Sequence, residues 1–234
     1  MPQEDASTDR TPHQSRNRQP AASVASATRA ERPTPRPVRR RDPKQAREES
    51  LHGISPETAV FVSLCFEGPD VYSTAGGLGT RVAEFTEALA SQGYQTHLIF
   101  VGDPNKPSVE DRAGGKLRIE RWGQWISKYY PNGVYDGEEG KLNDYNDSVP
   151  RHVCDDIARP AIADGKIVVI IGEDWHTAEA ISRVSDLLYA ANLRNRALIM
   201  WNCNSLMSLH RVNWGRLGYT AAITTVSRYM KHRL

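Results

Sequence analysis

A glycine-rich turn is the first segment of this chain whose residue types point to chemistry. Gly76, Gly77 and Gly79 follow a short apolar run and lead into a stretch with helical periodicity. Glycines let backbone amides at a helix N-terminus approach an anion closely, and the helix dipole favours a phosphate there. The turn completes neither the dinucleotide fingerprint, where Val82 replaces the third glycine, nor a P-loop, which needs Gly-Lys-Ser/Thr. It is a candidate anion site, with a purely structural strand-to-helix turn as an equal alternative.

A second candidate segment contains a histidine. The tetrapeptide Asp-Trp-His-Thr, which begins at Asp174, follows another apolar run. At a sheet edge, His176 could exchange protons near neutral pH or hydrogen-bond a substrate hydroxyl. The structural alternatives are that Asp174 or Thr177 caps a helix and that a hydrogen bond simply holds the histidine in place. Two later apolar runs also end in polar residues, at Asn204 and Ser227.

Six short runs of β-branched and aromatic residues must position these segments. Helical periodicity separates the runs, which is the pattern of βαβ units and a parallel sheet. Several are apolar at nearly every position, as expected of strands that helices cover on both faces. The predicted strands are 59–66, 96–101, 117–122, 167–171, 197–201 and 222–226. The predicted fold class is α/β, a doubly wound, Rossmann-like parallel sheet whose first and fourth predicted strands lie side by side and bind ligands beyond their carboxyl ends.

Three helices are expected between these strands. An apolar stripe over 78–89 predicts the first, which ends near Gly93. The second is predicted around 181–188. The third is predicted over 149–163, where Pro160 should end or kink it.

Two segments lack the periodicity of strands and helices. Residues 122–147 are rich in Gly, Tyr, Asn and Asp and are predicted to form a long surface loop. The first fifty residues hold half of the fourteen prolines and almost no large apolar side chains. Such a segment cannot bury enough apolar surface to offset the entropy of ordering it. The sequence therefore predicts a disordered tail over 1–53 in front of one domain over 54–234.

The basic charge of the chain lies in this tail. The first fifty residues carry eleven basic and seven acidic residues, which leaves 19 basic and 21 acidic residues in the remainder, so no nucleic-acid surface is expected on the domain. No apolar run is long enough to span a membrane, and acidic residues in the tail argue against a targeting peptide. Cys65, Cys154 and Cys203 suggest neither a disulfide framework nor a zinc site, so a cytoplasmic location is expected.

Together these segments resemble the starch- and glycogen-synthase branch of retaining glycosyltransferases, which have two facing Rossmann domains, the glycosyltransferase B fold. The resemblance covers the chain from Ala59 to its end and corresponds to the N-terminal domain of that pair. Its most specific pieces are the Asp-Trp-His tripeptide at Asp174 and the Ile-Thr-Thr-Val-Ser step from Ile223 to Ser227. Further matches are the glycine turn, the Gly93-Tyr94 step and, more loosely, the turn from Trp201 to Asn204.

The resemblance implies an activity and a role for each candidate residue. The activity is transfer of a sugar from a nucleotide-sugar donor to a glycan or other hydroxyl acceptor, with retention and with no cofactor or metal. In that family the glycine turn lies against the nucleotide diphosphate, and the histidine lies beside the transferred sugar. The resemblance therefore implies a catalytic role for His176. It implies substrate binding for Gly76, Gly77, Gly79, Asp174, Asn204 and Ser227.

The chain departs from that family in two ways. Thr74 stands where these synthases usually carry a lysine, so the expected donor is a nucleotide sugar that need not be ADP-glucose. The second domain, which carries most donor-binding residues, would begin near Leu234, so the chain is expected to be a fragment with little transfer of its own. The alternative from another class is an inactive fragment that binds an acceptor or a partner. A nicotinamide-dependent oxidoreductase is disfavoured by Val82.

Overall fold

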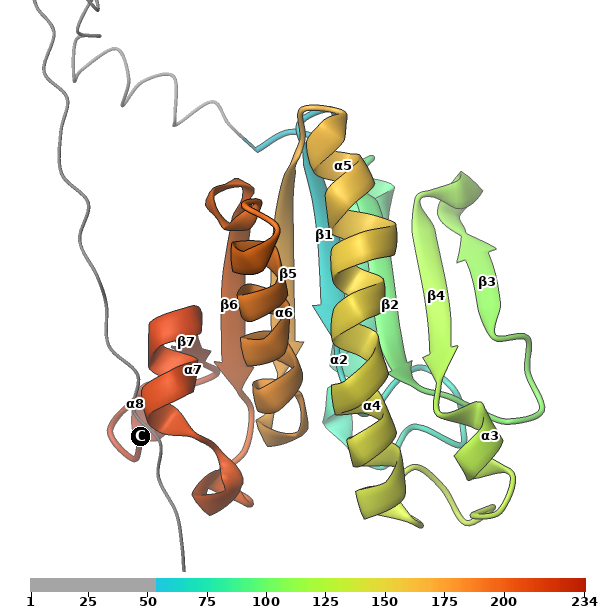
Figure 1. The fold of residues 1–234 in the computed structure, drawn as a ribbon. Helices are drawn as coiled ribbons and strands as arrows, with labels where there is room; N and C mark the ends of the chain where they lie inside the picture. The colour runs from blue at the N-terminus through green and yellow to red at the C-terminus, as the bar shows by residue number, and fades with distance from the viewer. Residues whose placement is uncertain (1–53) are drawn as a thin grey trace, which may run out of the picture. The chain divides into compact units, whose positions relative to one another are not determined.

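The computed structural model describes residues 54–234, and the tail predicted over 1–53 lies outside the described residues. A seven-stranded sheet forms the centre of the described part of the chain. The strand order is β3-β4-β2-β1-β5-β6-β7, and every neighbouring pair is parallel except β3 with β4 (Figure 1). The strands are β1 (Ala59–Leu64), β2 (Gln95–Val101), β3 (Val109–Arg112), β4 (Leu117–Trp122), β5 (Ile167–Glu173), β6 (Ala197–Cys203) and β7 (Ala222–Thr225). The predicted α/β class with a Rossmann-like, mostly parallel sheet is confirmed.

The six predicted strands are all present, and the structure adds a seventh. Strand β3 has the sequence Val-Glu-Asp-Arg and pairs antiparallel with β4 at the edge of the sheet. Short, charged strands are typical of sheet edges, where they discourage pairing with another sheet. A four-residue polar strand carries no apolar alternation, so the sequence pattern did not indicate it.

The central position of β1 brings distant segments to one edge of the sheet. Leu64 at the end of β1 pairs with Gly172 on β5, and Glu173 pairs with Asn202 on β6. The predicted side-by-side placement of the first and fourth predicted strands is thus confirmed. Because β1, β5 and β6 are parallel, the segments that follow Leu64, Glu173 and Cys203 leave the sheet at the same edge.

Helices cover both faces of the sheet (Figure 1). They are α2 (Gly77–Ser91), α3 (Gln124–Ser127), α4 (Glu138–His152), α5 (Arg159–Ala163), α6 (Ala178–Ala190), α7 (Trp214–Thr220) and α8 (Arg228–Lys231), with the short turns η1 (Ala113–Gly115), η2 (Val153–Ala158), η3 (Trp175–Thr177), η4 (Arg194–Arg196) and η5 (Leu209–Arg211). On one face, Tyr145 of α4 and Ile181 of α6 share a buried core with β1 and β5. On the other, Val82 of α2 joins a second buried cluster with Leu98. Within residues 54–234, no helix combines the length and apolar character that a membrane crossing requires.

The segment 122–147 is not the loop that the sequence predicted, because it contains α3 and most of α4. Helix α4 is polar apart from one buried stripe formed by Leu142, Tyr145 and Val149. Gly140 and several Asn and Asp residues have low helix propensity, which made the sequence look irregular. Burial of the stripe against the sheet outweighs this weak local preference, so the helix forms.

Of the two effects predicted for Pro160, an end or a kink in the helical run over 149–163, the end is not found, because the run continues to Ala163. A π-helical turn, η2, precedes α5, and Pro160 lies in the first turn of α5. Proline lacks a backbone N–H, and its ring needs space against the preceding turn. The wider π turn changes the hydrogen-bond pattern just before the proline and meets both requirements.

A buried carboxylate on the sheet contacts two histidines, His97 of β2 and His152 at the end of α4, and the second contact joins α4 to the sheet. Glu120 on β4 contacts Nδ1 of His97 at 2.8 Å and Nε2 of His152 at 2.7 Å. Burial opposes the ionisation of Glu120, but the hydrogen bonds from His152 and His97 outweigh it and lower the pKa of Glu120 to about 2. The hydrogen bond to Glu120 likewise raises the pKa of His152, which also contacts Asp156 at 2.8 Å.

This cluster predicts that the protein loses stability as the pH rises above the ordinary histidine pKa of about 6.5 and through the raised pKa of His152. A histidine whose pKa is raised by folding contributes stability that is complete below its unfolded pKa near 6.5 and is lost as the pH rises through the folded pKa. A hydrogen bond to a charged group contributes about 1.5–3 kcal/mol, so the thermal midpoint should fall by several degrees. Calorimetry across this range measures the loss. His152→Gln should flatten the profile, and a constant wild-type midpoint would contradict the assignment.

Candidate functional site

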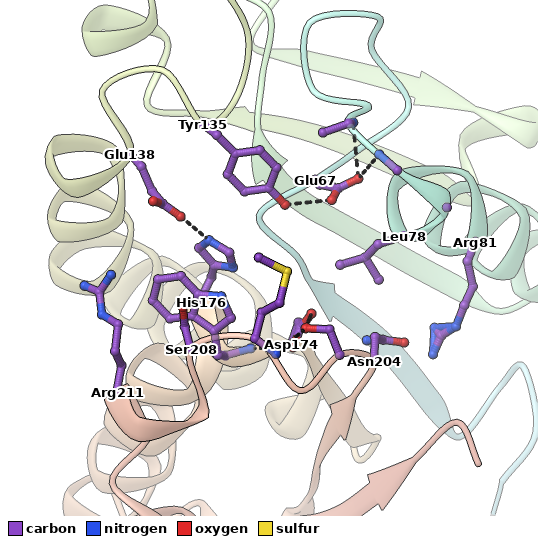
Figure 2. Close-up of a pocket in the computed structure, with 16 residues that line it drawn as sticks. Glu67, Leu78, Arg81, Tyr135, Glu138, Asp174, His176, Asn204, Ser208 and Arg211 are labelled. Carbon is purple, nitrogen blue, oxygen red and sulfur yellow. Dashed lines mark hydrogen bonds and ion pairs between the residues drawn. The ribbon is translucent and has the colours of Figure 1, made fainter. Parts of the chain in front are cut away.

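A cavity of about 650 Å³ opens at the carboxyl edge of the sheet, where four segments of the chain meet (Figure 2). Its walls come from the turn after β1, the start of α4, the loop after β5 and the loop after β6. The lining residues are Glu67, Ala75, Gly76, Gly77, Leu78, Arg81, Tyr135, Glu138, Asp174, Trp175, His176, Asn204, Ser205, Met207, Ser208 and Arg211. Of the residues that the sequence singled out, Gly76, Gly77, Asp174, His176 and Asn204 therefore share one cavity, whereas Gly79 and Ser227 do not line it.

The glycine turn surrounds an anion that belongs to the protein itself. The amides of Ala75, Gly76 and Gly79 donate to Oε2 of Glu67 over 3.3, 3.1 and 3.2 Å. The hydroxyl of Tyr135 donates to Oε1 of the same carboxylate over 2.7 Å (Figure 2). A carboxylate is stabilised at a helix N-terminus for the same reason as a phosphate. The anion-binding chemistry predicted for the turn is therefore used internally by Glu67, and its contact with a diphosphate stays a prediction.

The glycines of the turn differ in what surrounds them. A Cβ at Gly79 would lie 2.7 Å from the carbonyl oxygen of Gly68, so this glycine is required for close backbone packing. A Cβ at Gly76 or Gly77 would meet nothing within 4 Å, because both face open space at the cavity. Ser227 lies away from the cavity and caps α8, where its Oγ accepts from the amide of Met230 over 3.2 Å.

His176 is a buried side chain held in one orientation. Its ring stacks on Trp175 and on Phe66, with centroid distances of 3.8 and 4.3 Å. Its Nε2 contacts Oε1 of Glu138 at 2.7 Å (Figure 2). Burial lowers the pKa of His176 despite the opposing effect of Glu138, so the ring is neutral at neutral pH. Because a carboxylate only accepts hydrogen bonds, Nε2 carries the proton and Nδ1 is an acceptor.

Asp174 is held in a strained backbone conformation beside this histidine. Its φ of 61° and ψ of 175° lie in a region that glycine usually occupies, at a cost of about 1–3 kcal/mol. Its Oδ1 accepts from the amide of Trp175 over 3.0 Å, and its Oδ2 accepts from Ser205 Oγ over 2.9 Å. Asp174 therefore does cap a short helix, η3, as the structural alternative proposed. Burial raises the pKa of its carboxyl group in spite of these hydrogen bonds.

Sequence reasoning did not single out four charged residues that line the cavity, Glu67, Arg81, Glu138 and Arg211, nor Glu173, which pairs with Arg81. Glu173 is buried, and its carboxylate contacts Arg81 at 3.0 Å and accepts from the side-chain amides of Asn202 and Asn204 over 3.0 and 2.7 Å. Burial raises the pKa of Glu173, and the amides and Arg81 oppose the shift. Arg81 thus supplies a cation at the cavity, whereas the hydroxyl of Thr74 donates to backbone carbonyls. A glutamate directly after an apolar strand was the signal in the sequence.

A buried lysine shapes the wall that carries Tyr135. Nζ of Lys141 donates to the hydroxyl of Tyr72 over 2.7 Å and to the carbonyls of Gly133 and Asp136 over 3.0 and 2.5 Å. Burial lowers the pKa of Lys141. These contacts fix the turn before α4, which places Tyr135 over Glu67. The sequence did not indicate this arrangement, because the contacts are with backbone carbonyls and with Tyr72, which lies 69 positions away in the chain.

Carboxylates outnumber cations around the cavity. Its lining includes Glu67, Glu138 and Asp174 against Arg81 and Arg211. Arg211 lies over the Trp175 ring, 4.4 Å from its centroid, and contacts a neighbouring glutamate. Within residues 54–234, no group of three or more His, Cys, Asp and Glu side chains is arranged to hold a metal ion. The arrangement offers several hydrogen-bond acceptors and stacked rings, which suits a ligand rich in hydroxyl groups.

No family model and no curated protein sequence matches this chain. Among solved structures, the chain is similar to the catalytic domain of starch synthase IV from Arabidopsis thaliana bound to ADP and acarbose. The similarity has a TM-score of 0.44 and 18% sequence identity, and it covers 63% of this chain and 34% of the other. The chain thus corresponds to about a third of the length of that structure.

Proposed function

We propose that this chain forms the acceptor-side part of a glycosyltransferase site. In this proposal a glycosyl unit moves from a nucleotide-sugar donor to a hydroxyl of a glycan or other acceptor, with retention. The observation that carries the proposal is the convergence of a neutral histidine, several carboxylates and an asparagine on one cavity with stacked aromatic rings. Nδ1 of His176 and the carboxylates of Glu138 and Asp174 are suitable acceptors for sugar hydroxyls.

In this proposal the residues around the cavity position the sugar and stabilise the charge that develops during transfer. In the transfer, the bond between the anomeric carbon and the donor phosphate oxygen breaks, and a bond to the acceptor oxygen forms. The acceptor proton leaves with the departing diphosphate. Positive charge develops at the anomeric carbon, and the carboxylates around the cavity would stabilise it in a site partly shielded from water. His176 would hold a hydroxyl of the transferred sugar in place through Nδ1.

The second candidate function is a binding module that holds a glycan without transferring it. The observation that favours it is Glu67, which already occupies the N-terminus of α2 and accepts from the amides that a donor diphosphate would use. A second negative charge beside this carboxylate would be repelled. Under this alternative the cavity takes the hydroxyl-rich ligand alone.

A transfer assay tests the proposal and separates it from this alternative. The complete natural polypeptide that contains the chain is incubated with a panel of nucleotide sugars and glycan acceptors, and NMR follows the anomeric configuration of the product. We expect release of nucleoside diphosphate and a product with the donor's configuration. Acceptor binding without transfer from any donor would support the binding module, and an inverted product would reject retention.

A matched pair of variants refines this assay. Glu138→Ala frees the ring of His176 and removes a cavity carboxylate, so transfer should fall by about tenfold or more. Glu84→Ala removes an exposed carboxylate on α2 and should leave transfer unchanged. Equal rates in the two variants would show that Glu138 does not orient the histidine for transfer.

A further inference from the structure

A second cavity, of about 450 Å³, lies between α4 and the segment that follows β4. Aromatic rings line one side of it, and polar residues of α4 line the other. We call this cavity the aromatic groove. Its lining residues are Trp125, Ile126, Tyr129, Tyr130, Gly140, Asn143, Asp144 and Asp147. The exposed fractions are 63% for Trp125, 79% for Tyr129 and 40% for Tyr130. Exposed aromatic surface gathered at one place marks an interaction site.

The chain beneath the groove holds two of the rings in place. Tyr72 donates its hydroxyl to the carbonyl of Tyr130 over 2.7 Å. The ring of Tyr130 packs on the backbone at Gly137, where a Cβ would lie 2.5 Å from the ring. The indole N–H of Trp125 donates to Oδ1 of Asp144 over 3.3 Å. A surface that is formed before binding loses little conformational entropy when a ligand docks on it.

The polar side of the groove is acidic. Asp144 and Asp147 line it, and no lysine or arginine lies among the lining residues. Trp125 contacts one oxygen of Asp144, and Arg183 contacts one oxygen of Asp147. Each carboxylate therefore keeps a second oxygen as an acceptor. Burial raises the pKa of Asp144, the hydrogen bond from Trp125 opposes the shift, and the charge of Asp147 adds to it. A cationic ligand would be attracted here, whereas phosphates and carboxylates would be repelled.

The length of the groove fits an extended peptide. Between Gly140 and Asp147, α4 rises by roughly 10 Å at the pitch of an α-helix. One turn of polyproline II helix contains three residues and rises by about 9 Å. A neighbouring cavity of about 530 Å³ shares Trp125 and Asp144 with the aromatic groove. The surface thus continues past Trp125 and has room for a segment longer than one turn.

We propose that the aromatic groove is a docking site for a proline-rich, arginine-bearing peptide segment of a partner polypeptide. Grooves lined by aromatic side chains bind polyproline II segments, because that conformation is preformed and loses little entropy on docking. Proline rings would pack against Trp125 and Tyr129. An arginine of the peptide would pair with Asp144 or Asp147 and lie over a neighbouring ring. The inference goes beyond the proposed function, since docking requires no transfer.

The sequence of the chain contains a segment with this chemistry, which supplies the probe. Residues 33–41 read Pro-Thr-Pro-Arg-Pro-Val-Arg-Arg-Arg. A fluorescein-labelled peptide of this sequence is titrated with the full chain, and fluorescence anisotropy measures the Kd. A second probe peptide has glutamine in place of each arginine. Both titrations are repeated with a full-length variant in which glycine and serine replace residues 33–41, so that no second copy of the sequence competes with the probe.

We expect the arginine peptide to bind, and the glutamine peptide to bind about tenfold more weakly because it lacks the charge. Trp125→Ala and Tyr129→Ala should each weaken binding of the arginine peptide by about tenfold, the usual effect of removing an aromatic anchor. Asp144→Asn combined with Asp147→Asn should remove the preference for arginine and leave the glutamine peptide unaffected. Tyr219→Ala is the matched control, because Tyr219 is 91% exposed on α7 and lies outside the groove.

Four results would overturn the proposal. The first is failure of the arginine peptide to bind the variant with residues 33–41 replaced, and the second is equal affinity in Tyr129→Ala and Tyr219→Ala. The third is equal affinity of the two peptides for the wild-type chain. The fourth is binding of tetramethylammonium or maltohexaose that depends on Tyr129 when the peptide does not bind. Because Tyr129 is so exposed, its variant should fold normally even if Trp125→Ala does not. Peptide binding that depends on Tyr129 stands even where replacement of His176 leaves transfer unchanged, so the test is separable from the proposed function.

Discussion

Under the proposed function, replacing His176 is expected to lower glycosyl transfer by about a hundredfold or more for each folded molecule, the loss typical of a positioned active-site hydrogen bond. The ring is neutral and oriented by Glu138, and in the proposed function its Nδ1 accepts a hydrogen bond from a sugar hydroxyl. Because the ring is buried between Phe66 and Trp175, His176→Ala should also lower stability. His176→Phe keeps a ring in the stack and removes both nitrogens, so it should lose transfer while losing less stability.

The measurement combines a transfer rate with a thermal midpoint for each variant. His210→Ala is the control, since His210 is an exposed histidine in the loop after β6 and lies outside the cavity lining. It should keep both the rate and the midpoint. A purely structural histidine would cost about 1–3 kcal/mol of stability through its lost hydrogen bond, and activity would fall only with the folded fraction. A normal rate per folded molecule in His176→Phe would therefore reject the catalytic role.

The largest expected loss of stability follows from substitution of Asp70. Its side chain and that of Arg121 have no exposed surface, and Nε and Nη2 of Arg121 donate to the carboxylate over 2.8 and 3.1 Å. Lys106 and the amide of Asp103 complete its contacts. Asp70→Ala leaves a buried guanidinium without its main partner, so the free energy of unfolding should fall by about 3–5 kcal/mol. The carbonyl of Asp70 also accepts from Thr74, so the segment before the glycine turn should loosen.

Urea denaturation of the wild type and of Asp70→Ala measures the loss of unfolding free energy. Repeating it at one pH above and one pH below the pKa of Asp70 tests whether the ionised carboxylate is the cause. Burial favours the neutral form of Asp70, but the hydrogen bonds from Arg121 and Lys106 outweigh it and lower the pKa of this carboxyl group. Its contribution is therefore present above the unfolded pKa near 3.9 and is lost as the pH falls through the lower folded value. Asp111→Ala, which removes an exposed carboxylate 3.5 Å from Arg118, should change stability by less than about 1 kcal/mol. A similar small loss for both variants would refute the buried-pair argument.

The local pattern of residue types in the sequence was sufficient to predict the sheet and part of the site. β-branched runs separated by helical periodicity predicted all six parallel strands, because strands buried on both faces must be apolar along their length. Once the first and fourth predicted strands are neighbours, the segments that follow them must meet. For that reason Gly76, Gly77 and His176 share a cavity, as the sequence analysis expected.

The rest of the site depends on contacts between residues far apart in the sequence. Helix α4 forms because Leu142, Tyr145 and Val149 are buried against the sheet. Its polar residues alone do not predict a helix. It then places Glu138 against His176, a pairing across 38 positions of the chain. The β3 strand depends in the same way on its pairing with β4.

Tertiary contacts also determine which anion lies at the glycine turn. The sequence determined that amides at the start of α2 would favour an anion, since the glycines and the helix dipole are local properties. It did not determine that Glu67 would be that anion, because the carboxylate reaches the turn only when the loop after β1 folds back on α2 and Tyr135 closes over it. Local residue types thus determined what the turn can bind, and the distant contacts that fold the loop decided what it binds within the domain.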